Sequence, residues 1–460
     1  MAVLTSDAVG RIHEASLELL SDPGVRFEHD AVCSALLKAG ATLGSGSQVL
    51  RIPRELVEEC LERAPRTVAF ADRRGGMQTI PSKEGACVWS TPGVNWWRRG
   101  EVRPITSADL ADYARLLDQL PAVDGVFGTA LADVPPKTAD IAGLRIMADN
   151  TTKHIRVLCS SPAGADTMCR MKPVVADTPW FSIGFTAHGP LRWTHLALDI
   201  FARTAGHGIP ITINGEPMAG TSGPVTLAGA AAVGNAEILA GLVVNQILDP
   251  GRPCIYNLGL AHVFDMKTAV AVTGAPENHL LAGVSAELAR FYGLPSCSWV
   301  STEALAPDAQ ATLEKSIGWT THMMSRVSLV WGVGQLESEL TVSPAMAVID
   351  QEILDYVARY CRGITASDDA LALDVIREVG IAGEYLSHEH TFRHFRSELY
   401  EPGILWRGKR GDHSAAAAGD LAARAEERAE RFIAAEREPC LSDDQRGEMR
   451  AIAAYAAEHE

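Results

Sequence analysis

The chain has 460 residues, 47% of them hydrophobic, which is enough to bury the core of one barrel-sized domain or of two or three smaller ones. Its formal net charge is −16 and it has no run dense in lysine or arginine. These properties argue against a nucleic acid or an anionic membrane as partner, since both require concentrated positive charge. An acidic exterior suits a protein whose ligand is a cation or a small zwitterion.

The first residues, Met1 to Asp7, contain no basic segment followed by an apolar one, and no apolar run approaches the roughly 20 residues that span a bilayer. We therefore expect a cytoplasmic protein. Its nine cysteines form no Cys-x-x-Cys pair, a pattern typical of small buried side chains in a reducing compartment. Neither a disulfide framework nor a structural zinc site is indicated.

Residues 1–80 are predicted to form an N-terminal helical segment that packs on the rest of the chain. Apolar residues recur at helical spacing from Ile12 to Leu20 and from Leu56 to Leu61. Pro53 and Pro65 mark the start and the end of the second of these helices.

Residues 81–345 alternate between short apolar runs and longer amphipathic segments. Several runs are nearly continuous in apolar or β-branched residues, as expected of strands covered on both faces. The connecting segments at 227–248 and 276–292 have the length and composition of crossover helices. The eight runs are Cys87–Thr91, Gly125–Ala130, His154–Cys159, Trp180–Phe185, Pro210–Asn214, Pro253–Asn257, Cys297–Ser301 and Val327–Trp331.

Eight strand-then-helix units predict an α/β fold, a TIM (β/α)8 barrel, as the catalytic core. Residues 346–460 are predicted to close the barrel with further helices, and 412–460 to form an Ala/Glu/Arg-rich helical tail. Their apolar helical ends are compatible with a homo-oligomer.

Active sites of such barrels lie at the carboxyl ends of the strands, so polar and aromatic residues that follow the apolar runs are the candidates. Any one of them, taken alone, is better explained as a loop residue or a helix cap. The set is more informative than its members, because it combines carboxylates with tryptophans. The candidates are His188, Glu216, Asn257, His262, Asp265, Trp299, Ser301, Glu303, Trp331 and Glu337.

Trp299 and Trp331 are candidate walls of a cage for a methylated ammonium, since the face of an indole attracts a cation by about 0.5 to 2 kcal/mol. The alternative is that both pack in the barrel core, as large aromatic side chains commonly do. Glu216, Asp265 and Glu303 would place negative potential around the same pocket.

Two other motifs are weaker. The glycine-rich segment 220–229 lacks the ending of a P-loop and the spacing of a dinucleotide site, so it indicates a close backbone approach at the barrel mouth. His390 and His394 would share one face of a helix, but the sequence identifies no third ligand, and no metal site is predicted.

Four blocks between Ile209 and Glu314 occur in a fixed order and spacing. They are Gly220-Thr-Ser-Gly-Pro-Val-Thr-Leu-Ala-Gly229, Asn235-Ala-Glu237, Arg290-Phe-Tyr-Gly-Leu-Pro-Ser296 and Pro307-Asp-Ala-Gln310 with Glu314. Together they resemble the trimethylamine methyltransferase family. The resemblance extends over nearly the whole chain.

The resemblance implies a TIM barrel that moves a methyl group from an amine to the cobalt of a separate corrinoid protein. It implies no tightly bound cofactor in this chain, because the corrinoid (cobalamin) belongs to the partner. The trimethylamine branch of the family carries pyrrolysine where this chain reads Cys297 to Ala306, all standard residues. A lysine common in the family is replaced by Leu305. The chain is thus similar to the branch without pyrrolysine, which includes glycine betaine methyltransferases.

The leading hypothesis is a corrinoid-dependent methyltransferase acting on a quaternary amine of the betaine type. Glu303, Asp265 and Glu216 are its candidate catalytic residues. Trp299, Trp331, Ser301, Asn257, His262, His188 and Glu337 are its candidate substrate-binding residues. Two alternatives remain: a barrel that binds or senses betaine without methyl transfer, and a lyase or hydrolase that works without cobalt.

Overall fold

Eight parallel strands close a barrel in the order in which they occur along the chain, with the last strand paired to the first. The computed structural model describes residues 2–409 and 419–459. Each strand falls on one of the eight apolar runs, so the predicted α/β fold, a TIM (β/α)8 barrel, is confirmed. The strands are β6 (Cys87–Ser90), β9 (Gly125–Phe127), β10 (His154–Arg156), β11 (Phe181–Thr186), β13 (Ile211–Asn214), β15 (Cys254–Gly259), β18 (Ser296–Trp299) and β19 (Leu329–Val333).

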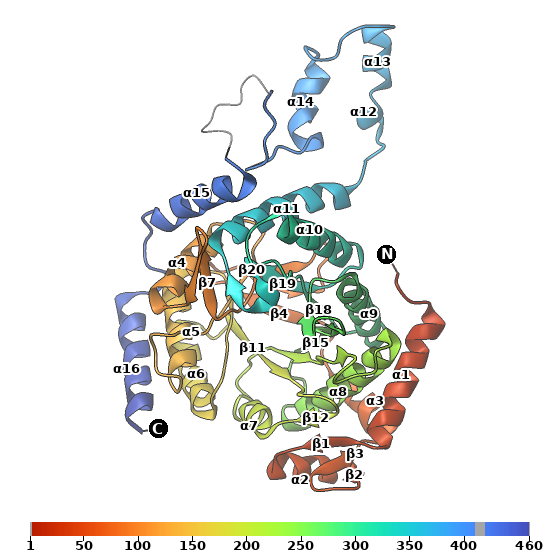
Figure 1. Cartoon of the computed structure of the whole chain (residues 1–460), viewed down its shortest axis with the longest axis vertical. Helices are drawn as coiled ribbons and strands as arrows, with labels where there is room; N and C mark the ends of the chain where they lie inside the picture. Colours follow the sequence, from red (N-terminus) through yellow and green to blue (C-terminus); the bar gives the residue numbers. More distant parts are fainter. Residues whose placement is uncertain (1, 410–418, 460) are drawn as a thin grey trace.

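Helices cover the outside of this barrel (Figure 1). The predicted crossover segments are helices with the predicted bounds, α8 and α9. The eight helices that follow the barrel strands are α4 (Ser107–Asp118), α5 (Ala139–Asn150), α6 (Pro162–Val175), α7 (His195–Arg203), α8 (Leu227–Leu248), α9 (Pro276–Tyr292), α10 (Ala309–Met324) and α11 (Pro344–Arg362).

Helix α8 is long and apolar enough, by length and composition, to cross a membrane. Its most apolar window is nevertheless 83% buried inside the protein, against α1, α3 and β15 among others. Asn235 within it donates to Ser16 and Tyr292 and accepts from Tyr256, which ties α1 to the barrel. Helix α8 is therefore a core helix.

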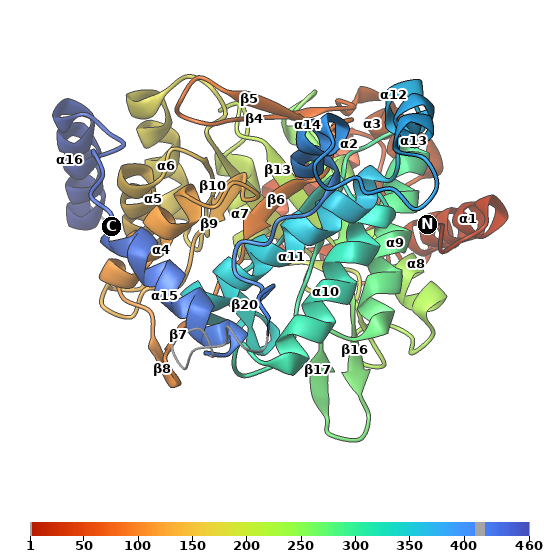
Figure 2. The same cartoon turned by 90° about the horizontal axis from the view of Figure 1, so that it is seen from above.

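A β-hairpin closes the amino-terminal end of the barrel (Figure 2). Its strands β4 (Val68–Ala71) and β5 (Met77–Ile80) pair antiparallel. Phe70 of β4 packs against two side chains of the barrel interior, with ring centroids 5.1 Å from Trp89 and 4.5 Å from His154. This end of the barrel is thus covered, and the opposite end, at the carboxyl ends of the strands, is called the mouth below.

The predicted N-terminal helical segment contains the expected helices and also five short strands. Three of these strands form a sheet with β12 (Arg192–Trp193), a strand outside the barrel. Strands of two to four residues are too short to produce a readable alternation of apolar and polar positions, which is why the sequence did not reveal them. The other elements are α1 (Ser6–Ser21), β1 (Val25–Phe27), α2 (Asp30–Lys38), β2 (Thr42–Leu43), β3 (Val49–Arg51) and α3 (Arg54–Arg63).

Two small sheets surround the mouth, and their hairpins project from the end of the molecule opposite to β4 and β5 (Figure 2). One sheet combines the segment after β6 with the segment after β19, and the other combines the segments after β13 and β15. The elements are β7 (Asn95–Arg98), β8 (Glu101–Pro104), β20 (Gln335–Leu336), the 3-10 turn η1 (Glu337–Glu339), β21 (Thr341–Val342), β14 (Met218–Ala219), β16 (His262–Asp265) and β17 (Val270–Val272).

The C-terminal helices lie outside the barrel. Helix α15 packs on α11 and α4, and α16 packs on α6 and α5, whereas α12 to α14 form an arm that projects from the body (Figure 1). Residues 412–418 and 460 of the predicted tail lie outside the described residues. The division into segments 1–80, 81–345 and 346–460 stays a prediction, and α11 crosses the last boundary. These helices are α12 (Asp368–Leu371), α13 (Leu373–Val379), α14 (Glu389–Glu398), α15 (Leu421–Ala434) and α16 (Asp443–His459).

Candidate functional site

Aromatic side chains line the barrel interior near the mouth. Trp299 and Trp331 are register partners on neighbouring strands and are 6% and 2% exposed. The ring of Phe127 meets the ring of Trp331 edge to face at 5.6 Å. Both indoles belong to the apolar cluster that fills the barrel, and the Nε1 atoms of both lack a hydrogen-bond partner among the described residues. The two tryptophans thus form part of the core, and the N–H of Trp331 lies near the Glu339 carboxyl.

Two carboxyls, Glu216 and Glu339, lie together at the mouth beside Trp331. Burial raises the pKa of Glu216 to about 7. Burial and repulsion from Glu216 raise the pKa of Glu339 well above its usual value. The neighbouring Trp331 side chain opposes part of this increase. Two carboxyls in one desolvated region resist ionisation, so the pair is poised to accept a cation.

Glu339 is held by an unusual backbone. Glu337, Ser338 and Glu339 all have positive φ, at 53°, 50° and 77°. Consecutive left-handed residues other than glycine store strain and persist only where surrounding contacts hold them. Nothing in the residue types of this turn signals the left-handed conformation, which explains why the sequence indicated Glu337 and missed Glu339.

Glu303 anchors this turn. Its Oε1 accepts hydrogen bonds from the backbone N of Thr273 at 2.6 Å and from Oγ of Ser338 at 2.9 Å. Its Oε2 accepts from the backbone N of Gly274 at 2.9 Å, where a Cβ would meet this oxygen at the same distance. The carboxylate chosen from sequence as catalytic therefore joins two mouth loops, and the chain's own donors occupy both oxygens.

Two polar networks support the mouth from below. Asn257, a predicted site residue, is fully buried and donates to Oδ1 of Asn214, which donates to Oγ1 of Thr186. Ser301, also predicted, accepts from Nε2 of Gln335 at 2.7 Å. These side chains fix the ends of the strands that carry the site.

His262 lies between these loops. Its Nδ1 is 3.0 Å from the carbonyl oxygen of Leu260. Burial lowers the pKa of His262, while nearby Glu303 acts in the opposite direction. The imidazole is therefore neutral at neutral pH and is placed as a polar wall of the mouth.

Three predicted residues lie apart from the Glu216 and Glu339 pair. His188 is exposed, with its Nδ1 3.1 Å from the carbonyl oxygen of Thr186. The Asp265 carboxylate accepts from the backbone N of Lys267 at 3.0 Å, inside its own hairpin turn. Glu337 accepts from Oγ1 of Thr341 at 2.6 Å. These groups satisfy local contacts, and the structure does not bring them together with the acidic pair.

A buried ion pair fixes the end of β19. Nζ of Lys315 lies 2.7 Å from Oδ2 of Asp350, with both side chains fully buried, and it donates to the carbonyl oxygen of Gly332 at 2.6 Å. Asp350 also accepts from the backbone N of Gly334 at 2.7 Å and from Nε1 of Trp319 at 2.9 Å. The pair therefore shapes the segment that leads from Trp331 to the strained turn.

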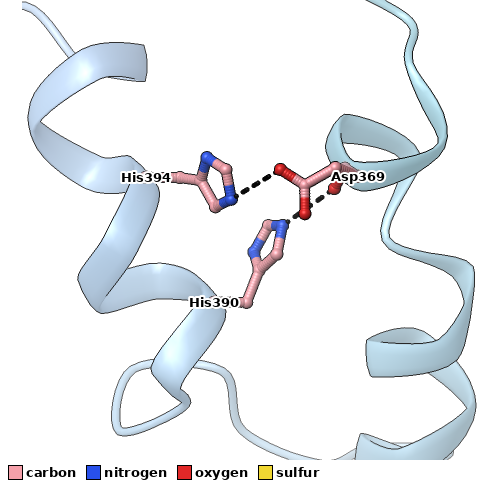
Figure 3. A group of neighbouring side chains, drawn as sticks. All are labelled: Asp369, His390 and His394. Atoms are coloured by element: carbon pink, nitrogen blue, oxygen red, sulfur yellow. Dashed lines mark hydrogen bonds and ion pairs between the residues drawn. The ribbon is translucent and has the colours of Figure 1, made fainter.

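The histidines of α14 acquire a third neighbour that the sequence did not identify. Nε2 of His394 lies 3.2 Å from Oδ2 of Asp369, and Nε2 of His390 lies 3.1 Å from the carbonyl oxygen of Asp369 (Figure 3). The three ligand atoms are within 4.8 Å of one another, close enough to hold a metal ion. The group lies on the projecting arm, away from the barrel mouth, and Asp369 is exposed. A solvent-exposed ion pair explains these contacts, so the prediction of no metal site stays a prediction.

Comparison with known proteins shows which proteins this chain is similar to. A family model described as trimethylamine methyltransferase (MTTB) matches residues 1–459. A trimethylamine methyltransferase of Methanosarcina barkeri is 30% identical over 458 residues, covering 93% of this chain and 90% of the relative. A glycine betaine methyltransferase of Desulfitobacterium hafniense is 28% identical over 415 residues, covering 87% and 86%. The crystal structure of the monomethylamine methyltransferase of Methanosarcina barkeri has a TM-score of 0.56 at 12% identity over 94% of this chain and 88% of that one, a likeness of fold alone.

Proposed function

Since the chain belongs to the trimethylamine methyltransferase family, we propose that it moves a methyl group from a quaternary amine of the betaine type to the Co(I) of a separate corrinoid protein. The observation that carries the substrate class is the Glu216 and Glu339 pair beside Trp331. Desolvated carboxyls next to a tryptophan form a site for a cation that has no proton to donate. We also propose that the reaction takes place in the cytoplasm.

The reaction does not require the protein to transfer a proton. A quaternary ammonium loses its methyl group and leaves as a neutral tertiary amine, so no general acid is needed. The corrinoid supplies the nucleophile. The residues of this chain position the cation, exclude water and leave the mouth open to the partner. Glu216 and Glu339 compensate the ammonium charge before the methyl group departs.

Exposed apolar side chains around the mouth support the docking of a partner. They lie on the segments that follow β6, β13, β15, β18 and β19, and Leu305, at the family's lysine position, is one of them. Exposed apolar groups that surround a cavity are typical of interaction surfaces. The set, called the mouth rim below, is Val94, Val102, Val225, Met266, Val270, Leu305 and Leu340.

A charge placed on the mouth rim should separate docking from chemistry. We expect Val270→Asp to raise the KM for a protein-borne corrinoid by about tenfold, the size of an interface hot spot, because it buries a carboxylate at the contact. The rate with free cob(I)alamin should not change. Leu43→Asp, on an exposed residue of β2 far from the mouth, is the matched control. Equal KM values for the two variants would remove the mouth rim from the docking surface.

The binding of a quaternary amine should depend on pH. The pKa of Glu216 is about 7 in the free protein, and a bound cation favours the ionised form and lowers it. Binding should therefore release protons, and the affinity should increase as the pH rises through about 7. Calorimetry in buffers of different ionisation enthalpy measures both effects. An affinity that is constant from pH 5.5 to 8 would show that Glu216 does not face the cation.

The reaction itself is tested with the purified chain, reduced cob(I)alamin, and a panel of trimethylamine, glycine betaine, carnitine and proline betaine. Methylcobalamin formation with a betaine and none with trimethylamine is the expected result, read from the absorbance change. Betaine binding without methylation of cobalamin or of the corrinoid proteins of the same organism would favour the binding or sensing alternative. Substrate turnover without any corrinoid would favour a lyase or hydrolase.

A further inference from the structure

Arg156 is a cation inside the barrel that has no anionic partner among the described residues. It is the last residue of β10 and is 5% exposed. Its Nη1 donates to the carbonyl oxygen of Val157 at 2.9 Å and its Nη2 to Oγ1 of Thr212 at 3.2 Å, while its Nε has no acceptor. Charged groups are rarely buried without a counter-charge, and an unsatisfied buried donor calls for an explanation.

The titratable groups nearest to Arg156 do not supply a counter-charge. They are the thiols of Cys297 and Cys159, whose pKa values burial raises well above the usual range, and His154, whose pKa burial lowers to about 3, so all three are neutral at neutral pH. Burial lowers the pKa of Arg156 itself to about 10, which leaves the guanidinium charged. The positive charge of Arg156 is therefore uncompensated.

A second buried arginine shows what a structural role looks like in this chain. Arg252 is 3% exposed and donates through Nε, Nη1 and Nη2 to oxygens of Ile209, Phe201 and Thr204. Asp249 also lies within its electrostatic reach. Arg252 is thus satisfied by the fold, whereas Arg156 retains donor capacity and charge.

The neighbouring strand β11 leaves room for the guanidinium. A Cβ at Gly184 would lie 1.6 Å from Nη2 of Arg156 and 2.3 Å from Oγ1 of Thr212, so only glycine fits there. Gly184 faces the barrel interior and remains partly exposed, as does Thr186, two residues nearer to the mouth. Some accessible surface therefore remains on this side of the barrel, between the level of the guanidinium and the mouth.

Aromatic contacts connect Arg156 to the acidic pair. Its Cζ lies 5.1 Å from the centroid of the Phe127 ring, and Phe127 meets Trp331, which neighbours Glu339. The interior thus has a positive end at Arg156, aromatic walls, and an acidic end at the mouth. A zwitterion with an ammonium and a carboxylate matches this polarity.

We propose that Arg156 binds the carboxylate of a zwitterionic substrate deep in the barrel, so that its methylated ammonium lies toward the mouth, beside the acidic pair. The inference rests on the proposed function and adds an orientation to it. Arg156 provides charge-assisted hydrogen bonds to the carboxylate. The N-methyl group then points toward the mouth, where the corrinoid approaches.

The test compares two ligands that differ only in the carboxylate. Glycine betaine and its amide, carbamoylmethyl-trimethylammonium, have the same cation and nearly the same shape. Titration calorimetry should show that the native protein binds betaine at least about tenfold more tightly, the value of a charge-assisted contact. Arg156→Met should reduce this ratio to about one without weakening the amide, and Arg156→Lys should retain part of it.

Equal affinities of the native protein for the two ligands would overturn the proposal without any variant, so a variant that fails to fold leaves the test decisive. An equal loss of affinity for both ligands in a folded Arg156→Met protein would also overturn the proposal. A betaine preference that disappears in Arg156→Met while no methyl reaches cobalamin would keep the carboxylate site and reject the proposed function. Methyl transfer from betaine and its amide at equal kcat/KM would keep the proposed function and reject the carboxylate site at Arg156.

Discussion

Replacing Glu216 by glutamine is expected to reduce kcat/KM for a quaternary amine by about 10- to 100-fold, which corresponds to about 1.4 to 2.7 kcal/mol of lost stabilisation. Burial raises the pKa of this carboxyl to about 7, so its ionised form interacts strongly with a cation that restores its charge. Glu339→Gln should have an effect of similar size, because repulsion from Glu216 shows that the two groups are close.

Glu337→Gln is the matched control for this pair. Glu337 lies two residues before Glu339 in the same strained turn, yet its carboxylate accepts from Thr341. We expect this variant to keep kcat/KM within about twofold of the native value, since a surface-type contact of this kind contributes little. Equal losses in Glu337→Gln and Glu339→Gln would mean that the turn matters for its shape and that the carboxyls of the pair do not contact substrate.

Replacing Lys315 by methionine is expected to lower the free energy of unfolding by about 3 to 5 kcal/mol, because it leaves Asp350 charged and unpaired in a fully buried position. The carbonyl oxygen of Gly332 would lose its donor in the same variant. Urea denaturation of the purified chain, followed by tryptophan fluorescence, measures the change.

The double variant Lys315→Met with Asp350→Asn should recover part of this loss, since it removes the uncompensated charge and keeps an acceptor for Trp319. Arg54→Met provides an exposed comparison, because its ion pair with Glu14 lies in solvent and should matter little. A Lys315→Met protein as stable as the native one would contradict the assigned role of the pair in fixing the end of β19.

The barrel was predictable from the sequence because its strands are covered on both faces. Such strands read as continuous apolar runs, and all eight coincide with strands of the structure. The crossover helices α8 and α9 were predictable for the same reason, since burial dictates their composition over 22 and 17 residues. Strand β1 of the N-terminal segment pairs with Arg192–Trp193, far away in the chain, and no local pattern encodes that contact.

The candidate site was predictable only in part. The rule that active residues follow the strands located Glu216, Trp299 and Trp331, because these lie within or directly after apolar runs. It could not find Glu339, whose position depends on a left-handed turn held by Glu303 and Ser338. It also passed over Arg156, the last residue of β10, which becomes a candidate only when the absence of an anionic neighbour among the described residues is visible.

The most direct test of the proposed function follows the methyl group itself. Glycine betaine with deuterated N-methyl groups is incubated with the purified chain and reduced cob(I)alamin, and both products are measured by mass spectrometry. The account predicts deuterated methylcobalamin and the demethylated amine in equal amounts, each formed only when both the chain and the corrinoid are present. Demethylated amine formed without cobalamin, or label that remains entirely in betaine after repeating the reaction with the corrinoid proteins of the same organism, would contradict it.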